Sequence, residues 1–249
     1  MNDLYSVSVV IPAYNCAETV GQAVDSCLSQ DIPVIIYCID DGSTDDLEGA
    51  LKPYLDMDCF HYVKNEKNMG VSKTRMRGVE MADTEYIAFL DADDWWAEGK
   101  LEKQLKLMKS TNAALTSTGR ELMTHDGKST GRIIGIDEVI DSKKILLTNC
   151  LNCSGVMVRR DAMLRFPMEH DDSHEDYISW IKIINEFGPA RGINEPLLKY
   201  RLSHGGKSRN KLKSAVMNYK VYRYCGFGRL KSLALNVSYA FNGVKKYYL

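Results

Sequence analysis

Residues 87–96 read IAFLDADDWW, so that an apolar strand runs directly into three carboxylates, Asp91, Asp93 and Asp94. Two carboxylates about 4 Å apart repel by roughly 4 kcal/mol at an effective dielectric constant of about 20, and the cluster therefore requires a cation, strong hydrogen bonds or protonation. A bound Mg²⁺ or Mn²⁺ is one interpretation, because the three carboxylates supply hard oxygen ligands at the carboxyl end of a strand. The alternative is a turn whose Asp side chains cap a helix.

The pattern around this stretch predicts an α/β fold with a doubly wound, mostly parallel sheet. Apolar runs typical of buried strands alternate with amphipathic helical patterns through the first 118 residues, as in βαβ units. We expect strands over residues 7–11, 34–39, 59–63 and 86–90, and helices over residues 20–28, 45–55, 71–82 and 101–108. Asn15 and Glu18 resemble a capping box, and Pro53 predicts a short or kinked second helix.

After residue 118 the pattern loosens. The sequence predicts helices near residues 137–147 and over 175–187, a strand over 154–158 and a mixed extension of the sheet. No linker divides the first 200 residues. We therefore expect one domain over residues 1–206, followed by a basic helical appendage over residues 207–249.

The composition is that of an ordinary globular protein with an uneven distribution of charge. The 249 residues are 45% hydrophobic and carry a net charge of −1, but all 33 acidic residues lie at or before Glu195, and 12 of the 32 basic residues follow it. No stretch is long and apolar enough to predict a membrane-spanning helix, and the first residues do not resemble a signal peptide. Seven cysteines at uneven spacing predict reduced thiols and a cytoplasmic location.

Polar residues follow three of the predicted strands. They are PAYN at 12–15, DDGSTD at 40–45 and DADD at 91–94. Because the carboxyl ends of parallel strands meet at one edge of a sheet, we expect the three groups to converge. The first two can accept hydrogen bonds from a nucleotide base or ribose, and the third can hold a metal on a diphosphate. A turn with a helix cap is the alternative for residues 40–45.

Four blocks of sequence resemble the family-2 glycosyltransferases of GT-A fold. They are VSVVIPAYN at 7–15, IDDGSTD at 39–45, NMGVS at 68–72 with Arg75, and LDADD at 90–94. The resemblance implies a GT-A fold with a Rossmann-like nucleotide-binding half. It also implies inverting transfer of a sugar from a nucleotide-diphosphate sugar, with UDP as the expected nucleotide, to a hydroxyl of a glycan or lipid-linked acceptor in cell-surface polysaccharide synthesis.

The resemblance further implies roles for individual residues. The nucleotide contacts would be Pro12, Tyr14, Asn15, Asp40, Asp41, Arg75, Asp91 and Asp93. Asp41 would be the partner of a uracil N–H. Asp93 and Asp94 match the ligands of Mn²⁺ or Mg²⁺ on the donor's two phosphates, and His204 matches a further contact to the metal or diphosphate.

The segment EHDDSHED at 169–176 leads into a predicted helix and resembles the family's Glu-Asp pair. The expected catalytic residues are therefore Glu175 and Asp176, with Asp176 as the general base for the acceptor hydroxyl, because a helix N-terminus favours the ionised form. Acidic residues that only complement the helix dipole are the alternative. We interpret His170 and His174 as solvated loop residues rather than metal ligands.

The last 43 residues, 207–249, hold ten basic residues and no acidic one, interleaved with tyrosines and apolar residues. Such a segment suits an anionic membrane surface, which would place the protein peripherally on the inner face of the plasma membrane. A packing or homodimerisation helix is the alternative. Nucleic acid is not an expected partner, because no recognised binding fold accompanies the charge.

Three rival functions share parts of this pattern. A sugar transferase acting on polyprenyl phosphate would use the same donor chemistry. A nucleotide-sugar-binding pseudoenzyme would keep Asp41, Asp93 and Asp94 but leave Asp176 far from the donor. A sugar nucleotidyltransferase would need a Gly-rich phosphate loop after the first strand, where this chain has PAYN.

Overall fold

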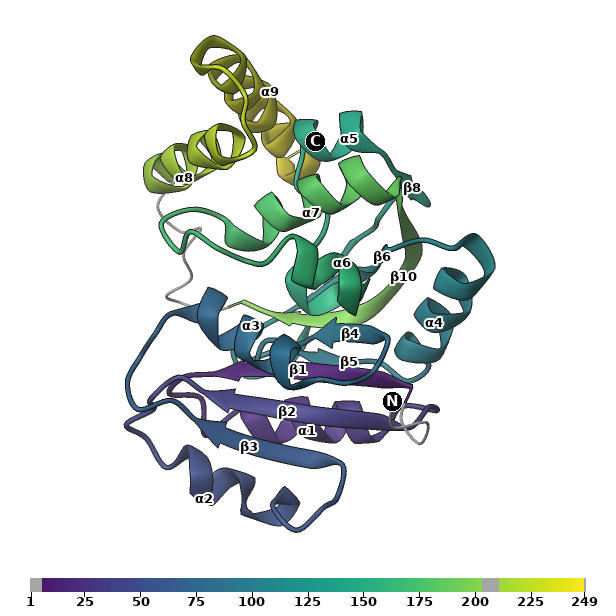
Figure 1. The fold of residues 1–249 in the computed structure, drawn as a ribbon, viewed down its shortest axis with the longest axis vertical. Helices are drawn as coiled ribbons and strands as arrows, with labels where there is room; N and C mark the ends of the chain where they lie inside the picture. The colour runs from purple at the N-terminus through teal and green to yellow at the C-terminus, as the bar shows by residue number, and fades with distance from the viewer. Residues whose placement is uncertain (1–5, 203–210, 249) are drawn as a thin grey trace.

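The computed structural model describes residues 6–202 and 211–248, in which a twisted mixed sheet lies between two layers of helices (Figure 1). Its strands are β1 (Val7–Ala13), β2 (Val34–Asp40), β3 (Phe60–Lys64), β4 (Tyr86–Phe89), β5 (Trp95–Trp96), β6 (Leu115–Met123), β7 (Ser129–Ile134), β8 (Val139–Ile140), β9 (Met157–Arg159) and β10 (Ala190–Arg201). The order across the sheet is β3-β2-β1-β4-β9-β6-β10-β5, with β7 paired to β6 and β8 paired to β10.

Among the described residues, the helices predicted over 20–28, 71–82, 101–108 and 175–187 begin and end within three residues of those bounds. The helices predicted over 45–55 and near 137–147 are shorter, and the helix over 160–165 was not predicted. The helices of the described residues are α1 (Val20–Leu28), α2 (Leu47–Leu51), α3 (Val71–Met81), α4 (Lys100–Thr111), α5 (Ser142–Leu147), α6 (Arg160–Arg165), α7 (Glu175–Phe187), α8 (Lys211–Tyr224) and α9 (Arg229–Tyr248). Two 3₁₀ turns, Lys52–Tyr54 and Cys153–Gly155, complete the regular structure.

The parallel half of the sheet confirms the doubly wound prediction. β1 pairs in parallel with both β2 and β4, and β2 pairs in parallel with β3. All seven residues of β2 are buried, as expected of a strand covered on both faces. In β1, alternate side chains enter opposite cores: Val9 packs with the layer formed by α1, α2 and α4, and Val10 with the layer formed by α3, α6 and α7.

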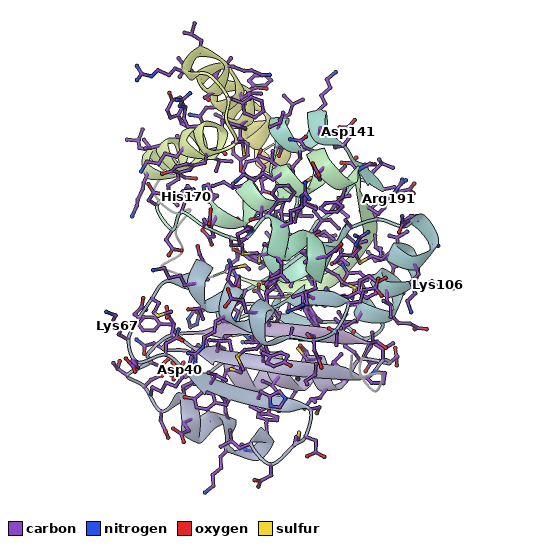
Figure 2. The ribbon with its side chains drawn as sticks, viewed as in Figure 1. Asp40, Lys67, Lys106, Asp141, His170 and Arg191 are labelled. Atoms are coloured by element: carbon purple, nitrogen blue, oxygen red, sulfur yellow. The ribbon has the colours of Figure 1, made fainter. Side chains whose placement is uncertain are left out.

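The second half of the sheet is mixed, as predicted. β9 is antiparallel to β4 and to β6, whereas β10 is parallel to β6. The expected strand over residues 154–158 begins later, at Met157, because residues 153–155 form a 3₁₀ turn. Figure 2 shows the two ends of the sheet: Asp40 and Lys67 lie at the carboxyl end of the parallel strands, and Lys106 lies toward the opposite end.

Two local expectations about helix ends have different outcomes. The second helix is short, as Pro53 predicted, since α2 ends at Leu51 and passes into the 3₁₀ turn. The capping box of Asn15 and Glu18 is wrong, because α1 begins at Val20 with Thr19 as its N-cap. Asn15 has a φ of 49° and uses its side-chain oxygen to accept from the amide of Thr44 at 2.8 Å.

The C-terminal helices α8 and α9 form a hairpin that packs against α5 and α7. Val221 and Tyr222 of α8 are fully buried, and the Tyr222 hydroxyl donates to the carbonyl of Leu146 at 2.7 Å. The expected boundary between residues 206 and 207 lies outside the described residues. Across residues 6–202 and 211–248, no helix combines the length and the apolar character needed to span a bilayer.

Candidate active site

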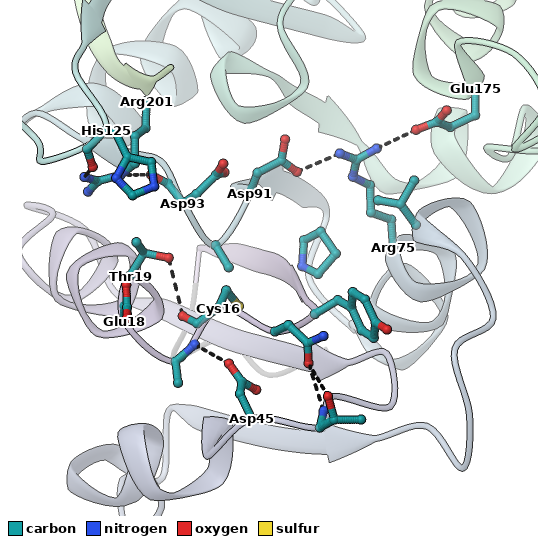
Figure 3. A pocket seen from close by; sticks show the side chains of 17 residues that line it. Cys16, Glu18, Thr19, Asp45, Arg75, Asp91, Asp93, His125, Glu175 and Arg201 are labelled. Atoms are coloured by element: carbon teal, nitrogen blue, oxygen red, sulfur yellow. Dashed lines mark hydrogen bonds and ion pairs between the residues drawn. The ribbon is translucent and has the colours of Figure 1, made fainter. Parts of the chain in front are cut away.

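A pocket of about 1040 Å³ opens at the carboxyl ends of β1 and β4 (Figure 3). Its walls come from the loops after β1, β2 and β4, from α3 and α7, and from the ends of β6 and β10. Its lining residues are Pro12, Tyr14, Asn15, Cys16, Ala17, Glu18, Thr19, Thr44, Asp45, Val71, Arg75, Asp91, Ala92, Asp93, His125, Glu175 and Arg201. Polar groups at three strand ends thus converge, as the sequence predicted.

The loops after β1 and β2 are bonded to each other. The amide of Asn15 donates to Oγ of Ser43 at 3.0 Å, and Oδ1 of Asn15 accepts from the amide of Thr44. The amide of Ala17 donates to Oδ2 of Asp45 at 2.8 Å. These reciprocal bonds hold the two loops as one rigid floor for a bound ligand.

Asp41 is held by the backbone that opens α3. Its carboxylate accepts from the amides of Met69 at 2.8 Å and Gly70 at 3.0 Å, and from Nδ2 of Asn65 at 2.9 Å. The chain can make this turn because Gly70 has a φ of 91°, a left-handed conformation that side chains disfavour. Asp41 lines a second pocket of about 320 Å³, which shares Pro12 and Tyr14 with the larger one.

Asp40 lies beneath this floor and is fully buried. Burial alone would raise its pKa, but hydrogen bonds from Ser43 and Tyr62 and the nearby Lys64 ammonium outweigh that effect and hold the pKa below its ordinary value. Asp40 is not among the residues that line either pocket. Its contacts fix the loop that presents Asp41.

Arg75, on the buried side of α3, bridges two parts of the chain. Nη2 donates to Oδ1 of Asp91 at 2.6 Å, and Nη1 donates to Oε1 of Glu175 at 3.0 Å, as the dashed lines of Figure 3 show. Only 5% of Arg75 is exposed, so this guanidinium is a buried cation surrounded by carboxylates. It neutralises part of the acidic cluster that follows β4.

Asp93 and Asp94 point to different surroundings. Asp93 lines the pocket, and burial together with the charge of Asp91 raises its pKa to about 6. Asp94 is buried behind the wall, where its Oδ1 accepts from the amide of Arg201 at 2.8 Å and its Oδ2 has no hydrogen-bond partner among the described residues. Burial raises the pKa of Asp94 well above its ordinary value.

The cluster has the chemistry of a partial site for a divalent cation. A bound cation would compensate the Asp93 carboxylate, whose pKa is raised by burial and by the charge of Asp91 although Arg201 opposes them. Within the part of the chain that the structure describes, no three His, Cys, Asp or Glu side chains gather closely enough to hold a metal by themselves. The donor set therefore fits a metal that takes most of its ligands from phosphate oxygens and water. His204 lies outside the described residues.

The predicted catalytic pair opens α7. Glu175 lines the pocket and bonds to Arg75, whereas Asp176 is partly buried beside it and accepts from the amide of Tyr177 at 2.8 Å. Burial and the charge of Glu175 raise the pKa of Asp176 to about 6, although Arg75 opposes them. Such a carboxylate is ionised at neutral pH and is more basic than a solvated Asp, as a general base requires.

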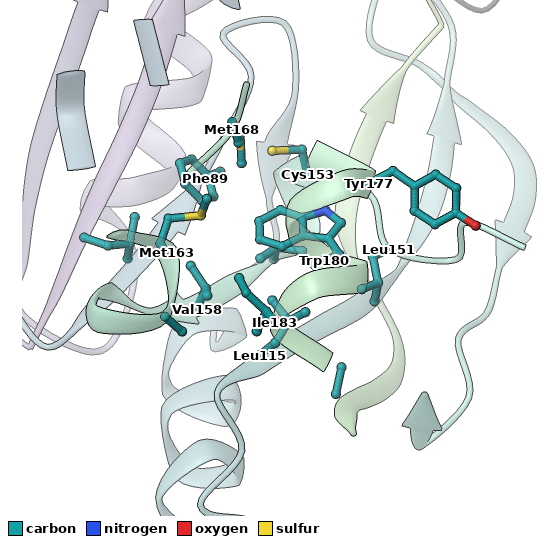
Figure 4. Close-up of a cluster of buried hydrophobic side chains, with 14 of the residues drawn as sticks. Phe89, Leu115, Leu151, Cys153, Val158, Met163, Met168, Tyr177, Trp180 and Ile183 are labelled. Atoms are coloured by element: carbon teal, nitrogen blue, oxygen red, sulfur yellow. The ribbon is translucent and has the colours of Figure 1, made fainter. Parts of the chain in front are cut away.

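Buried aromatic residues anchor α7 (Figure 4). Tyr177 and Trp180 are fully buried, and the Trp180 ring lies 6.2 Å from that of Phe89 on β4. The Tyr177 hydroxyl donates to the carbonyl of Ile145. This packing fixes the first turn of α7, and with it Glu175 and Asp176, relative to the strand that precedes the acidic cluster.

Arg201, at the end of β10, is a pocket residue that the sequence pattern did not identify. Its Nε donates to the carbonyl of Asp93 at 2.7 Å, its Nη1 to the carbonyl of His125 at 2.7 Å and its Nη2 to Gln22 at 2.6 Å. The guanidinium also lies 4.8 Å from the centre of the Trp95 ring. Arg201 lies in the segment YRLSH at 200–204, three residues before His204, the predicted metal or diphosphate contact.

The structure groups the predicted site residues in two ways. The pocket brings together Pro12, Tyr14, Asn15, Arg75, Asp91, Asp93 and Glu175, and the adjoining pocket adds Asp41. Asp40, Asp94 and Asp176 do not line either pocket. The roles of all the predicted site residues stay predictions. His170 is exposed, as expected of a solvated loop residue, although its ring stacks on Tyr224. His174 is half-buried, and its Nε2 lies 3.5 Å from Oγ of Ser214.

Comparison with known sequences gives one family and a consistent set of relatives. Residues 8–165 match the profile of glycosyl transferase family 2. A Bacillus subtilis protein named as a putative teichuronic acid biosynthesis glycosyltransferase, TuaG, is 35% identical over 96% of this chain and 96% of its own length. The Escherichia coli UDP-Glc:alpha-D-GlcNAc-diphosphoundecaprenol beta-1,3-glucosyltransferase WfaP is 30% identical over 97% of this chain and 95% of its own length.

Solved structures with this fold include nucleotide-sugar complexes. TarS of S. aureus, with structures in complex with UDP and with UDP-GlcNAc, matches with a TM-score of 0.72 at 14% identity over 96% of this chain and 72% to 73% of that one. The mannosyltransferase PcManGT of Pyrobaculum calidifontis, in complex with GDP-Man and Mn²⁺, matches with a TM-score of 0.69 at 15% identity over 100% of this chain and 77% of that one. At these identities the match establishes the GT-A fold alone.

Proposed function

This chain belongs to glycosyl transferase family 2, and we propose that it transfers a hexose from a UDP-sugar, with inversion, to a hydroxyl of a lipid-linked glycan in cell-surface polysaccharide synthesis. One observation carries the proposal: Arg75 joins Asp91, at the donor end of the pocket, directly to Glu175, the neighbour of the proposed base. This bridge supports a single site for the donor residues and Glu175, with Asp176 next to it in the chain, whereas a pseudoenzyme would leave Asp176 remote.

The base of the nucleotide would bind over Pro12 and Tyr14 against Asp41. Tyr14 is 50% exposed and offers a ring face for stacking. The Asp41 carboxylate accepts three hydrogen bonds, which leaves acceptor capacity for one more, and the imide N–H of uracil can supply the donor. This contact supports UDP as the nucleotide, in agreement with the UDP-Glc named for WfaP.

Asp93 would hold Mn²⁺ or Mg²⁺, with His204 as a further expected ligand and Asp94 as support behind the wall. When bound there, such a metal would supply positive charge to offset the negative charge of the leaving diphosphate. The Arg201 guanidinium, next to Asp93, adds fixed positive charge to the same wall of the pocket.

Asp176 would act as the general base. As the acceptor oxygen forms its bond to the anomeric carbon, its proton passes to the Asp176 carboxylate, and the bond from the anomeric carbon to the phosphate oxygen breaks on the opposite face. The leaving electrons go to the nucleoside diphosphate, so the configuration inverts. Glu175, bonded to Arg75, would position the base rather than take the proton itself.

The hairpin of α8 and α9 would dock on an anionic bilayer, where a lipid-linked acceptor resides. Leu230, Leu233, Val237 and Phe241 recur along α9 at helical spacing and are 54% to 85% exposed. Residues 207–249 hold ten basic residues and no acidic one, which complements anionic lipid and opposes pairing with an identical hairpin. A helix pair lying on the surface, not spanning it, fits the described helices.

The donor assignment is tested by calorimetry of the full chain with UDP and with GDP, each with and without Mn²⁺. We expect UDP to bind in the presence of Mn²⁺, and the Asp93→Ala variant to lose most of that metal-dependent affinity. Preference for GDP would overturn the UDP assignment, and equal binding without metal would overturn the role of Asp93.

The acceptor assignment is tested by a transfer assay. Transfer to a polyprenyl phosphate, but not to a lipid-linked sugar, would favour the rival transferase.

The membrane assignment is tested by co-sedimentation with vesicles. Wild-type protein should bind vesicles that contain phosphatidylglycerol and not those of phosphatidylcholine alone, and Leu230→Glu with Phe241→Glu should abolish the binding. Ile133→Glu removes another exposed apolar side chain, 62% exposed on β7, and is the matched control. If the wild-type protein does not bind vesicles but dimerises in solution, and the α9 substitutions abolish the dimer, the exposed face of α9 would instead bind a second copy of the chain.

A further inference from the structure

Residues 169–174, here called the strap, form the second part of the loop that connects α6 to the proposed catalytic helix α7. Its side chains reach in two directions. His170, Asp172 and His174 contact α8 of the C-terminal hairpin, whereas Asp171 contacts the start of α3 at the nucleotide pocket. One short loop therefore touches the hairpin, the pocket wall and the catalytic pair.

The contacts with α8 centre on Tyr224. The ring of His170 stacks on the ring of Tyr224 with centroids 3.8 Å apart and an interplanar angle of 1°. The Tyr224 hydroxyl donates to Asp172 at 3.1 Å, and Nζ of Lys220 donates to the same carboxylate at 2.7 Å. His170 adopts a φ of 69°, uncommon for a residue with a side chain, and such a conformation persists only where neighbours fix it.

On its other side the strap bonds to the nucleotide pocket. Oδ1 of Asp171 accepts from the amide of Ser72 at 3.1 Å and from the Ser72 hydroxyl. Asp171 lines the smaller pocket together with Asp41, and a Cβ on Gly70 would overlap its Oδ2. The strap therefore contacts the turn at residues 69–70, whose amides donate to Asp41.

The strap ends at the catalytic pair. Ser173 is fully buried, its amide and hydroxyl both donate to the carbonyl of His170 at 2.9 Å, and the next residues are His174, Glu175 and Asp176. Glu175 then returns to α3 through Arg75. A shift of the strap would therefore move the wall beside Asp41 and the first turn of α7 together.

We propose that Tyr224 and Lys220 of α8 are positioning residues of the transfer reaction, which hold the strap so that Asp171 closes the nucleotide pocket and Asp176 faces the acceptor. The inference rests on the proposed function and extends it to a helix that lies outside the pocket. Its physical basis is preorganisation: a loop fixed before the donor binds loses less conformational entropy on binding, and small displacements of reacting groups reduce rates strongly.

The first test compares three variants of the full chain by UDP calorimetry with Mn²⁺ and by transfer kinetics. Tyr224→Leu removes the stacked ring and the hydroxyl, and we expect the Kd for UDP and the KM for the donor to rise about threefold to tenfold, as for the loss of one stacked aromatic contact. Tyr224→Phe keeps the stack and should lie between Tyr224→Leu and wild type. Tyr219→Leu is the matched control, because Tyr219 lies on the same helix and makes none of these contacts.

The second test asks whether the strap transmits the effect. Tyr224 and Ser72 bond to different residues of the strap and not to each other. Without transmission, the effects of Tyr224→Leu and Ser72→Ala on the Kd for UDP would multiply. We expect the double variant to bind UDP no more than about twofold more weakly than the worse single variant, because either change alone loosens the strap. Ser72→Ala removes the hydroxyl contact with Asp171 and keeps the amide contact.

Two results would overturn the inference while leaving the proposed function intact. One is that the wild-type chain binds UDP and the Tyr224→Leu variant has the same UDP Kd and donor KM as the wild type. The other is full multiplication of the two effects in the double variant. If the wild-type chain itself fails to bind UDP, the proposed function fails instead. Tyr224→Phe keeps the test valid if Tyr224→Leu does not fold.

Discussion

Nη2 of Arg75 lies 2.6 Å from Oδ1 of Asp91, so the first carboxylate after β4 already has a buried protein cation as its partner. Asp93, two residues later, has no such partner for its carboxylate among the described residues, since Arg201 bonds to its backbone carbonyl. This difference suggests separate roles for the carboxylates of Asp91 and Asp93. Asp91 belongs to the framework that joins α3 to α7, and Asp93 is the group that a metal would compensate.

Arg75→Met should destabilise the fold, because it leaves the carboxylates of Asp91 and Glu175 without their shared cation. Breaking a buried ion pair by removing one partner costs about 3–5 kcal/mol. Arg75→Lys retains the charge but cannot make both hydrogen bonds, and should lose about half of that. Urea unfolding at pH 7 measures the effect. Lys73→Met, at an exposed position of the same helix, is the control and should change the free energy of unfolding little. Equal stability of Arg75→Met and wild type would show that the bridge is not formed in solution.

Asp176→Asn should reduce kcat by about 10² to 10⁴ while UDP binding stays near that of wild type, as expected when a general base is removed. In the wild-type enzyme, burial and Glu175 raise the pKa of Asp176 to about 6. The base works only when ionised, so kcat at saturating donor should fall about tenfold per pH unit below that value and level off above it.

A separate measurement distinguishes Asp176 from Asp93, whose pKa is also raised to about 6. UDP affinity, measured by calorimetry over the same pH range, reports on the donor side alone. A kcat that follows only the loss of UDP binding would assign the pH dependence to Asp93. An Asp176→Asn variant that keeps more than about a tenth of the wild-type kcat would remove Asp176 as the base.

The sequence was sufficient to predict the parallel half of the fold and its strand ends. β1, β2 and β4 are short apolar runs followed at once by polar residues, and in a parallel sheet those ends must meet on one edge. The start of α7 was also predictable, since the apolar spacing from Tyr177 onward fits only a helix. The local sequence pattern was enough to predict an element where it was a short apolar run or a regular helical spacing.

β10 and the contacts of Arg75 show what local pattern could not reveal. β10 contains Gly192, Glu195 and Pro196, and its pairing with β6 shifts register between Ile193 and Leu198, so no regular alternation marks it. By spacing alone Arg75 is one more polar residue of an amphipathic helix, and the family resemblance implied only a contact with the nucleotide. Its partners Asp91 and Glu175 are 16 and 100 residues away, and only the folded chain identifies it as a buried bridge.

Gly70→Ala should weaken UDP binding at least about tenfold. A Cβ at this position would overlap Oδ2 of Asp171, and relieving that clash must move the amide that donates to Asp41. The left-handed φ of 91° adds strain of about 1 kcal/mol or more. Gly131→Ala is the matched control, because Gly131 has a φ of 71° but nothing within 4 Å of the methyl group that alanine would add. Equal UDP affinities of the two variants would contradict the prediction that a clash with Asp171 weakens UDP binding.

Lys100 should make the protein more stable as the pH rises from 7. Its ammonium is fully buried over the Trp96 ring, 4.0 Å from the centroid, and donates to Oε1 of Gln104 at 2.7 Å. Burial lowers its pKa from 10.5 to about 7. Between those values the unfolded chain binds the proton more than the folded chain does, so the free energy of unfolding increases with pH across this window.

The comparison with Lys100→Met isolates this contribution. Each pKa unit is worth about 1.4 kcal/mol, so between about pH 7 and 8.5 the wild type should gain up to about 2 kcal/mol relative to the variant. Urea unfolding under reducing conditions measures both proteins at each pH. The range ends below about pH 9 because the buried thiols of Cys27 and Cys38 have raised pKa values and act in the opposite sense once their unfolded forms ionise. Parallel pH profiles for the two proteins would show that the folded chain keeps Lys100 charged.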